Sequence, residues 1–265
     1  MTDSFVKSGP NPLGEAAGLR WLAEAHSDGG ARIAEVIDVS EQRLEIEHID
    51  SAPPSAAGAR AFGAALARTH AAGASWWGCP PDGWSGPAWV GNSQTPLVVD
   101  RDHAKATWGQ FYAQHRIDEF ARRLRADGVI GADDARLYAR LAARLDNGDF
   151  DVAQPQLVRG AGHAVARVHG DMWSGNVLYD GASTGAALID PMAHGGHAET
   201  DLATLSVFGF PYLDDVYAGY DEASPLADGW RERVGLHQLG IVIMHAHLFG
   251  GSYIGASARL ADQYV

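Results

Sequence analysis

The chain has 265 residues, of which 46% are hydrophobic and 20% charged, a composition that predicts a folded protein with a sizeable core. Its formal net charge of −13 argues against binding to nucleic acids or to anionic membrane surfaces. The single cysteine, Cys79, excludes an intramolecular disulfide and a cysteine-rich zinc site. Neither a signal peptide nor a membrane-length apolar run is recognisable, which predicts a soluble cytoplasmic protein.

The first fifty residues are expected to form a small α+β unit. A short apolar run, Phe5-Val6-Lys7, precedes a proline- and glycine-rich break at residues 8–12. Residues 14–25 have helical spacing, residues 33–39 favour a strand, and residues 44–49 alternate apolar and polar side chains as a half-buried strand does. Pro53-Pro54 then indicates a boundary.

The remaining residues are predicted to be mainly helical. Helices are expected at residues 58–71, 105–127 and 132–145, and again from residue 201 to the end. Residues 73–96, rich in glycine, proline and tryptophan, predict an irregular loop whose indoles pack in the core. Residues 160–190 are glycine-rich, with short strands at 177–179 and 187–189. A small front unit and a larger helical unit favour a ligand cleft between them.

One group of polar residues indicates which reaction the protein catalyses. His169-Gly170-Asp171 is followed by Asn176, five residues after Asp171, and then by Asp190 at the end of an apolar strand. This spacing is typical of phosphoryl transfer, in which a carboxylate orients the acceptor hydroxyl and takes its proton. An amide oxygen and a second carboxylate then hold Mg²⁺ against the nucleotide phosphates.

The same constellation differs from that of protein kinases in two places. Protein kinases have an arginine in the H-R-D motif and a phenylalanine in the D-F-G motif. Gly170 and Pro191 stand at those two positions, which indicates a small-molecule kinase. The bare motif leaves aminoglycoside and choline kinases open as alternatives.

Longer stretches of the sequence resemble the fructosamine kinase (ketosamine-3-kinase) family. Residues 169–176 (HGDMWSGN) resemble the family signature HGDLWSGN, and residues 190–203 resemble its segment DPAxxYGHxExDLA, with His194 where the family often has Tyr. Residues 108–116 and 245–253 resemble two of its helices. The resemblance implies an α+β, protein-kinase-like fold with a reduced N-lobe over residues 1–50 and a mostly helical C-lobe over residues 51–265.

The resemblance also implies roles for individual residues. Asp171 would be the catalytic base, and Trp173 would line the sugar pocket. The implied ATP–Mg²⁺ site comprises Lys7 on the phosphates, Glu15 paired with Lys7, a hinge of Glu47, His48 and Ile49 that holds adenine, and the Mg²⁺ ligands Asn176 and Asp190.

The implied reaction is ATP-dependent phosphorylation of a sugar hydroxyl on a small-molecule or protein-bound ketosamine, a deglycation step. One rival is an aminoglycoside- or choline-type phosphotransferase. The other is a catalytically silent kinase-like binding protein, because the sequence starts almost at the lysine strand and lacks the family's glycine-rich phosphate loop. For the same reason we expect weak binding of ATP.

Several further residues have side chains that could take part in binding or catalysis. His197, Glu199 and Asp201 are expected to tie the loop after Asp190 to the loop at Asp171 by hydrogen bonds, with a metal site as the rival interpretation. His245 is expected to be structural, and Cys79 an inert thiol.

Overall fold

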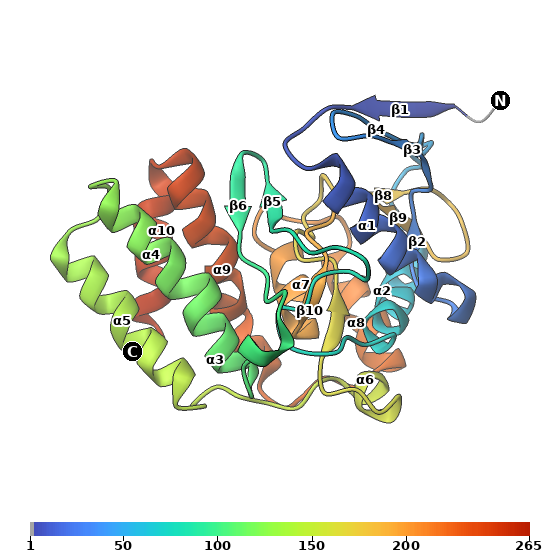
Figure 1. Cartoon of the computed structure of the whole chain (residues 1–265). Helices are drawn as coiled ribbons and strands as arrows, with labels where there is room; N and C mark the ends of the chain where they lie inside the picture. The colour runs from blue at the N-terminus through green and yellow to red at the C-terminus, as the bar shows by residue number, and fades with distance from the viewer. Residues whose placement is uncertain (1–2) are drawn as a thin grey trace.

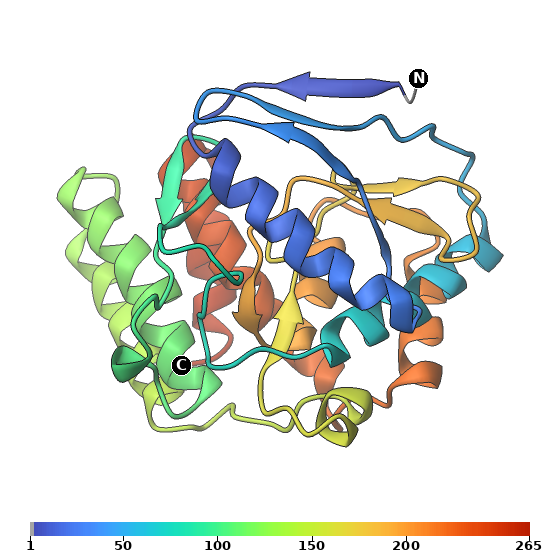
Figure 2. The same cartoon turned by 45° about the vertical axis from the view of Figure 1, so that its right-hand side comes forward.

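The computed structural model describes residues 3–265 and begins with a small antiparallel sheet. Strands β1 (Ser4–Lys7), β4 (Leu44–Glu47) and β3 (Val36–Val39) lie in the order β1-β4-β3. Leu44 and Ile46 of β4 are buried whereas Glu45 and Glu47 are partly exposed, as a strand with one covered face requires. The sheet lies at the top of the molecule in Figures 1 and 2.

Helix α1 (Pro12–Ala23) passes beneath this sheet (Figure 2). It starts at Asn11, whose side chain accepts a hydrogen bond from the backbone N–H of Gly14, and Pro12 occupies the first turn. Leu19 and Leu22 are buried on its inner face. A 3-10 turn over Glu24–Asp28 ends the helix.

Two small sheets carry the polar loops, and the first of them joins the front of the chain to the rear. Strand β9 (Ala186–Leu188) pairs antiparallel with β8 (Val177–Tyr179) and parallel with β2 (Arg32–Ile33). Strand β7 (Ala166–Val168) pairs antiparallel with β10 (His194–Gly196). The loop from β7 to β8 and the loop from β9 to β10 therefore emerge close together, and they carry Asp171, Asn176 and Asp190.

Helices form most of the remaining structure. They are α2 (Ala56–Ala71), α3 (Trp108–Tyr112), a π-helical segment (Ala113–Asp118), α4 (Glu119–Ala126), α5 (Ala132–Asp146), α6 (Gln156–Gly160), α7 (Ala198–Leu205), α8 (Leu213–Ala223), α9 (Trp230–Phe249) and α10 (Ser252–Asp262). In Figure 1, α3, α4, α5, α9 and α10 gather at one end of the molecule, and α2, α6 and α8 lie at the other. No helix among residues 3–265 has the length and apolarity needed to cross a membrane.

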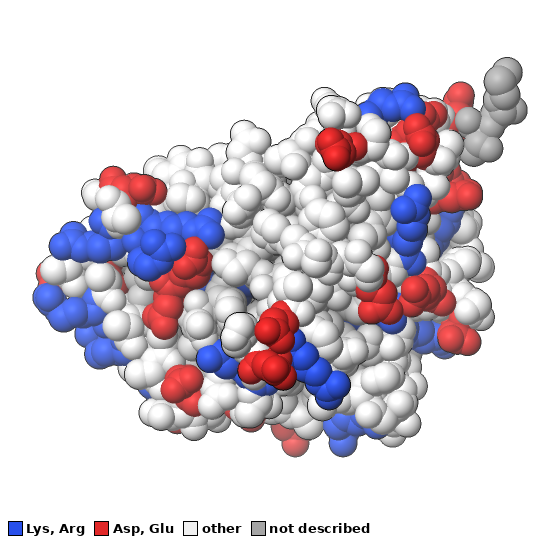
Figure 3. Space-filling view, viewed as in Figure 1, with Lys and Arg blue, Asp and Glu red and all other residues white. Residues whose placement is uncertain are grey.

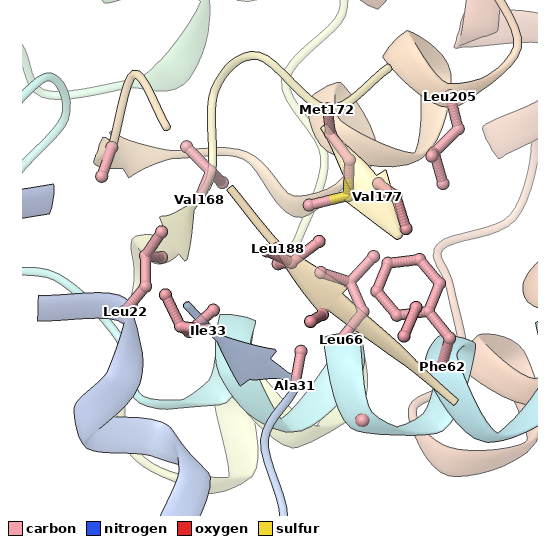
Figure 4. Packing of buried hydrophobic residues seen from close by; sticks show 14 of the residues in the cluster. Leu22, Ala31, Ile33, Phe62, Leu66, Val168, Met172, Val177, Leu188 and Leu205 are labelled. Carbon is pink, nitrogen blue, oxygen red and sulfur yellow. The ribbon is translucent and has the colours of Figure 1, made fainter. Parts of the chain in front are cut away.

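Two hydrophobic clusters hold these elements together. In the first, Leu22 of α1, Ile33 of β2 and Leu66 of α2 pack around Leu188 of β9 (Figure 4). Phe62 of α2 is fully buried in the same cluster, and burial of such a side chain contributes about 2–3 kcal/mol. The second cluster fills the helical end around α3–α5, α9 and α10. The strands that carry the polar loops thus rest on the larger of the two cores.

The expected α+β fold with a mostly helical C-terminal part is confirmed, with local differences, and the lobe boundary at residue 50 stays a prediction. The predicted helix over residues 105–127 begins at Trp108, where Thr107 caps it, and contains the π-helical segment. The predicted loop over residues 73–96 contains a hairpin of β5 (Ala88–Val90) and β6 (Ser93–Thr95). Strands β7 and β10 were not predicted, because Ala166-Arg167-Val168 and His194-Gly195-Gly196 lack the unbroken apolar run that marks β8 and β9.

Candidate active site

Lys7, Glu15 and Asp190 form a group of charges at the centre of the site. The Lys7 ammonium, at the end of β1, forms ion pairs with the carboxylates of Glu15 from α1 and Asp190 from the loop after β9. Burial alone would lower the pKa of Lys7, but the two carboxylates outweigh it and raise that pKa above 10.5. Burial raises the pKa of Glu15 to about 7 although Lys7 opposes the shift. The predicted Lys7–Glu15 pair is present in the structure.

Asp171 and Asn176 face one another across the loop between β7 and β8. The Asn176 side-chain amide donates to the Asp171 backbone carbonyl (2.8 Å), to Asp171 Oδ2 (3.1 Å) and to the Asp190 carbonyl (3.4 Å). Burial raises the pKa of Asp171 to about 7, and the hydrogen bond from Asn176 only partly opposes it. A carboxylate with a pKa near 7 is suited to accept a proton at neutral pH.

Asp190 adopts a strained backbone conformation directly after β9. Its φ of 54° lies in the left-handed region, which non-glycine residues rarely adopt. Such strain is often found at functional sites, where the surrounding structure holds it in place. Here the Ile189 N–H donates to the Asn176 carbonyl (3.1 Å), fixing the residue before the turn. The carboxylate of Asp190 is 46% exposed and lines the main cavity.

Asp201, from α7, anchors the loop that carries Asp171. Its fully buried carboxylate accepts hydrogen bonds from the backbone N–H of His169 (2.7 Å) and of Gly170 (2.9 Å), and from His70 Nε2 of α2 (3.1 Å). Burial would raise the pKa of Asp201, but the hydrogen bond and charge of His70 outweigh it and lower that pKa. Tyr220 of α8 contacts the other nitrogen of His70 (2.8 Å). Three helices thus fix the position of one loop.

Gly170 and His169 shape the turn just before Asp171. Gly170 has a φ of 83°, and a Cβ there would lie 2.3 Å from the Met192 carbonyl oxygen, so the tight approach of the two loops requires glycine. His169 accepts a hydrogen bond at Nδ1 from the Asp171 N–H (3.3 Å) and bonds the Ile189 carbonyl through Nε2 (2.8 Å). The histidine therefore links the two loops as a neutral ring.

His194 connects the loop after Asp190 to a buried arginine. Its Nδ1 bonds the Met192 carbonyl (2.8 Å), and its Nε2 lies 3.3 Å from a guanidinium nitrogen of Arg116. Burial, reinforced by the charge of Arg116, lowers the pKa of His194 to about 3, so the ring is neutral. Arg116 has no carboxylate within ion-pair distance among residues 3–265 and also donates to the Pro96 carbonyl (3.0 Å). At this position histidine therefore serves as the acceptor for a buried cation.

The main cavity of the described residues has a volume of about 600 Å³. Its lining includes the predicted site residues Lys7, Glu15, Asp171, Trp173, Asn176 and Asp190. It also includes aromatic side chains that sequence reasoning did not assign to a site: Trp84, Trp89, Phe208, His245, Phe249 and Tyr253. Trp84 and Trp89 belong to the loop predicted to supply packing only. The interpretation of His245 as structural only is therefore incomplete, because its ring lines the cavity.

Glu47, His48 and Ile49 are not among the residues that line this cavity. The His48 N–H donates to the Asp3 carbonyl (2.9 Å), the Glu47 N–H donates to the Glu35 carbonyl (2.8 Å), and Ile49 is buried. The backbone donors of the first two residues are thus occupied within the sheet. Their contact with adenine stays a prediction.

His197 and Glu199 do not join the loops at Asp171 and Asp190. The Glu199 carboxylate accepts two hydrogen bonds from Arg233 of α9 (2.7 and 2.9 Å) and lies 3.3 Å from His237. His197, Glu199 and His237 form the one metal-like cluster found within residues 3–265. Arg233 already satisfies Glu199, so an ion pair explains this carboxylate without a metal. Of the three residues predicted to tie the loops, only Asp201 binds the loop at Asp171.

Comparisons with known proteins agree with the geometry of the site. The sequence profile of the fructosamine kinase family matches residues 13–265. A protein named "Probable ketoamine kinase" from Lactiplantibacillus plantarum is 31% identical over 205 residues, which are 77% of this chain and 65% of that protein. The chain therefore spans slightly less than two thirds of that relative.

Solved structures extend the likeness to the fold. A protein from Thermobifida fusca assigned as a fructosamine-3-kinase has 36% sequence identity and a TM-score of 0.83, covering 99% of this chain and 85% of that one. The aminoglycoside phosphotransferase APH(2″)-IIa, in its complex with streptomycin and ATP, has 12% identity and a TM-score of 0.57, covering 99% and 87%. The second likeness concerns the fold alone, and the protein-kinase-like fold expected from the sequence is confirmed.

Proposed function

Because the chain belongs to the fructosamine kinase family, we propose that it transfers the γ-phosphoryl group of ATP to a sugar hydroxyl of a ketosamine. The observation that carries the proposal is the placement of Asp171. Its carboxylate is mostly buried, has a pKa near 7 and lies in the same cavity as the Lys7–Glu15–Asp190 group.

Each charged group has a distinct task in this reaction. Asp171 orients the acceptor hydroxyl and accepts its proton as the oxygen attacks phosphorus, a contribution of about 10²–10⁴ in rate. Lys7 supplies positive charge to the phosphates, and Glu15 holds the ammonium in place. Asp201 acts through the backbone of His169 and Gly170 and is a positioning residue.

The residues present fit a magnesium ion. Asn176 uses its amide nitrogen to bond Asp171 and Asp190, and no hydrogen bond from residues 3–265 reaches its Oδ1. That oxygen and the carboxylate of Asp190 form the hard oxygen set that Mg²⁺ prefers. When bound, the ion would neutralise negative charge on the phosphates. The chain's own contribution is to hold both oxygens on loops that Asn176 ties together.

ATP is the proposed donor because kinases of this fold use it, and APH(2″)-IIa has been solved with ATP bound. We propose that residues 1–50 act as the N-lobe over the nucleotide and that residues 51–265 act as the C-lobe. In this arrangement Glu47, His48 and Ile49 would contact adenine after a small rearrangement of the sheet edge.

The proposed acceptor is a ketosamine, a ketose that carries an amine on carbon 1. The names of the relatives point to this class, and fructosamine-3-kinase specifies the 3-hydroxyl for the structural relative. Trp173, two residues after the base and 38% exposed, offers an indole face against which a sugar ring can pack.

The test is a coupled assay of ADP release with a fructosamine as acceptor and free fructose as control. Phosphorylation of the fructosamine at its 3-hydroxyl, assigned by ³¹P and ¹³C NMR, would support the proposal. Preferential phosphorylation of an aminoglycoside or of choline would contradict it. Binding of Mg-ATP without turnover on any acceptor would favour a silent binding protein instead.

A further inference from the structure

A second, much smaller cavity lies where the loops at Asp171 and Asp190 meet the helical end of the molecule. Its volume is about 30 Å³, which is room for one water molecule or one small ion. Among residues 3–265, none that lines it is Asp or Glu, and the one Lys or Arg is Arg116. We call it the Arg116 cavity, and its lining includes Thr95, Phe111, Arg116, Met192, His194 and Met244. The lining therefore contains the charge of a guanidinium and no carboxylate to balance it.

Arg116 differs in this respect from arginines on the surface. Arg122 and Arg123, on the following helix, both pair with Glu119. At the α4–α5 end of the molecule the basic side chains accordingly lie beside acidic ones (Figure 3). Arg116 is only 5% exposed and forms no ion pair with a carboxylate among residues 3–265. Because a buried charge is costly without an opposite charge beside it, this guanidinium calls for a negative partner.

The neighbours of Arg116 use only some of its hydrogen-bond donors. One terminal nitrogen donates to the Pro96 carbonyl (3.0 Å) and to the His115 carbonyl (3.1 Å), and the other lies 3.3 Å from His194 Nε2. A guanidinium has five N–H donors, so two of them, including Nε–H, have no acceptor among residues 3–265. The Phe111 ring lies 4.9 Å from the guanidinium carbon and attracts it, but it carries no net charge. All of these neighbours are neutral.

Thr95 adds a further donor to the same cavity. Its fully buried hydroxyl donates to the thioether sulfur of Met244 (3.4 Å), which is a weak acceptor. Thr95 directly precedes Pro96, whose carbonyl binds Arg116, so the hydroxyl and the guanidinium belong to the same end of the cavity. A hydroxyl rotates freely about its C–O bond and can turn from sulfur to a stronger acceptor. The cavity thus offers two N–H groups and one O–H group to a single acceptor.

The backbone that carries Arg116 is also unusual. Arg116 lies in the π-helical segment Ala113–Asp118, and such segments are rare and frequently occur at functional sites. Through His194, four residues after Asp190, the guanidinium contacts the loop that follows β9. An occupant of the cavity therefore joins the helical end of the molecule to the loop that carries Asp190.

We propose that the Arg116 cavity binds one small inorganic anion of the size and charge of chloride. Such an ion balances the guanidinium charge and accepts hydrogen bonds from several directions, as the donors of Arg116 and Thr95 require. A water molecule also fits the volume, but it would leave the charge unbalanced. The nearby carboxylates Glu199 and Asp201 lie outside the lining and are already bound by other donors. The proposal concerns binding alone and does not depend on the kinase reaction.

Bromide locates the site directly, because it resembles chloride and its anomalous X-ray scattering distinguishes it from water. Crystals of the full chain soaked in sodium bromide should show an anomalous peak within hydrogen-bonding distance of the Arg116 guanidinium and the Thr95 hydroxyl. A map with a water molecule there and no anomalous signal would overturn the inference.

Thermal unfolding in solution measures the affinity. The unfolding midpoint is followed in sodium chloride and in sodium gluconate at the same ionic strength, because gluconate is too large for the cavity. Chloride at about a hundredfold excess over its Kd should raise the midpoint by about 5–10 °C relative to gluconate, and the rise should saturate. Equal midpoints in the two salts at every concentration would contradict the proposal.

Two variants assign the chloride effect to the cavity. Thr95→Val keeps the shape of the side chain and removes the hydroxyl, so it should weaken chloride binding about tenfold. Arg116→Met should abolish the difference between the two salts. Arg140→Met, at an exposed arginine of α5 outside the lining, is the matched control and should keep the full difference.

The outcomes are independent of the kinase assay, since no substrate is present. A chloride effect that survives unchanged in Thr95→Val and Arg116→Met would overturn the assignment of the anion to this cavity. If Arg116→Met fails to fold, Thr95→Val and the bromide map of the wild type decide the question. Failure of phosphoryl transfer would overturn the proposed function and leave the anion site standing.

Discussion

Replacing Asp171 by asparagine should abolish phosphoryl transfer and at the same time stabilise the protein at alkaline pH. The carboxylate is mostly buried, and burial raises its pKa from 3.8 to about 7. An ionised Asp171 is therefore unfavourable in the native state, and in the proposed reaction its ionisation is needed only for catalysis. Asparagine has nearly the same shape and carries no charge, so it removes the unfavourable ionisation together with the proposed base.

The magnitude follows from the two pKa values. A difference between about 7 and 3.8, at 1.36 kcal/mol per pH unit, corresponds to about 4 kcal/mol at most. The native pKa is raised above the unfolded value, so the native protein is disfavoured progressively as the pH rises from about 4 to about 7. The Asp171→Asn variant does not lose stability in this way, because asparagine does not ionise. The extra stability of the variant should be only about 1 kcal/mol at pH 4.5 and should reach its full value above pH 7.

Thermal unfolding of both proteins between pH 4.5 and pH 8.5 measures this difference. For a chain of this size 1 kcal/mol moves the midpoint by about 2–4 °C, so an increase of at least about 4 °C is expected at pH 8. In the wild type, kcat/KM should rise about tenfold between pH 6 and pH 8 as Asp171 ionises. Asp133→Asn, at an exposed carboxylate, is the control. A variant less stable than wild type at pH 8, or a difference that is the same at every pH, would refute the reasoning.

Three further substitutions probe the loops of the site. Asp190→Ala should remove the effect of Mg²⁺ on ATP affinity, since it deletes the proposed carboxylate ligand; calorimetry with and without Mg²⁺ would show this, and an undiminished Mg²⁺ effect would place the ligand elsewhere. Asp201→Ala should lower the free energy of unfolding by about 3 kcal/mol or more, because two backbone N–H groups and His70 lose a buried acceptor. Urea unfolding measures this free energy, and a loss below about 1 kcal/mol would contradict the anchoring role of Asp201. Gly170→Ala should lower both the thermal unfolding midpoint and kcat, because the alanine Cβ would meet the Met192 carbonyl oxygen in a left-handed backbone. A midpoint and a kcat equal to those of the wild type would show that the two loops can separate without cost.

The residues of the site could be predicted where the chemistry fixes their order along the chain. Asp171, Asn176 and Asp190 lie on two neighbouring loops because β8 and β9 pair, and two short apolar strands separated by a few residues indicate such a pairing. Lys7 was assigned through the family resemblance, and the structure places it against Asp190 from the far side of the cleft.

Other features depend on contacts between distant segments and leave no local pattern. Phe208 lies in the loop after α7, and no local pattern places it beside Phe249 of α9 and Tyr253 of α10, which are themselves only four residues apart. Asp201 and His70 are 131 positions apart, so the sequence alone could suggest only one end of their hydrogen bond. The hinge over residues 47–49 was assigned by resemblance, and the backbone N–H groups of Glu47 and His48 are occupied by the Glu35 and Asp3 carbonyls beside them.

The carboxylate of Asp201 has a consequence for the motions of the chain. Loop amides usually exchange their hydrogens with solvent quickly, because a small local opening exposes them. The amides of His169 and Gly170 are bound to a fully buried carboxylate, and opening them would leave that carboxylate with His70 as its one remaining side-chain donor among residues 3–265. Their deuterium uptake should therefore be as slow as that of core strands, which makes these two loop amides reporters of global opening rather than of local breathing at the site.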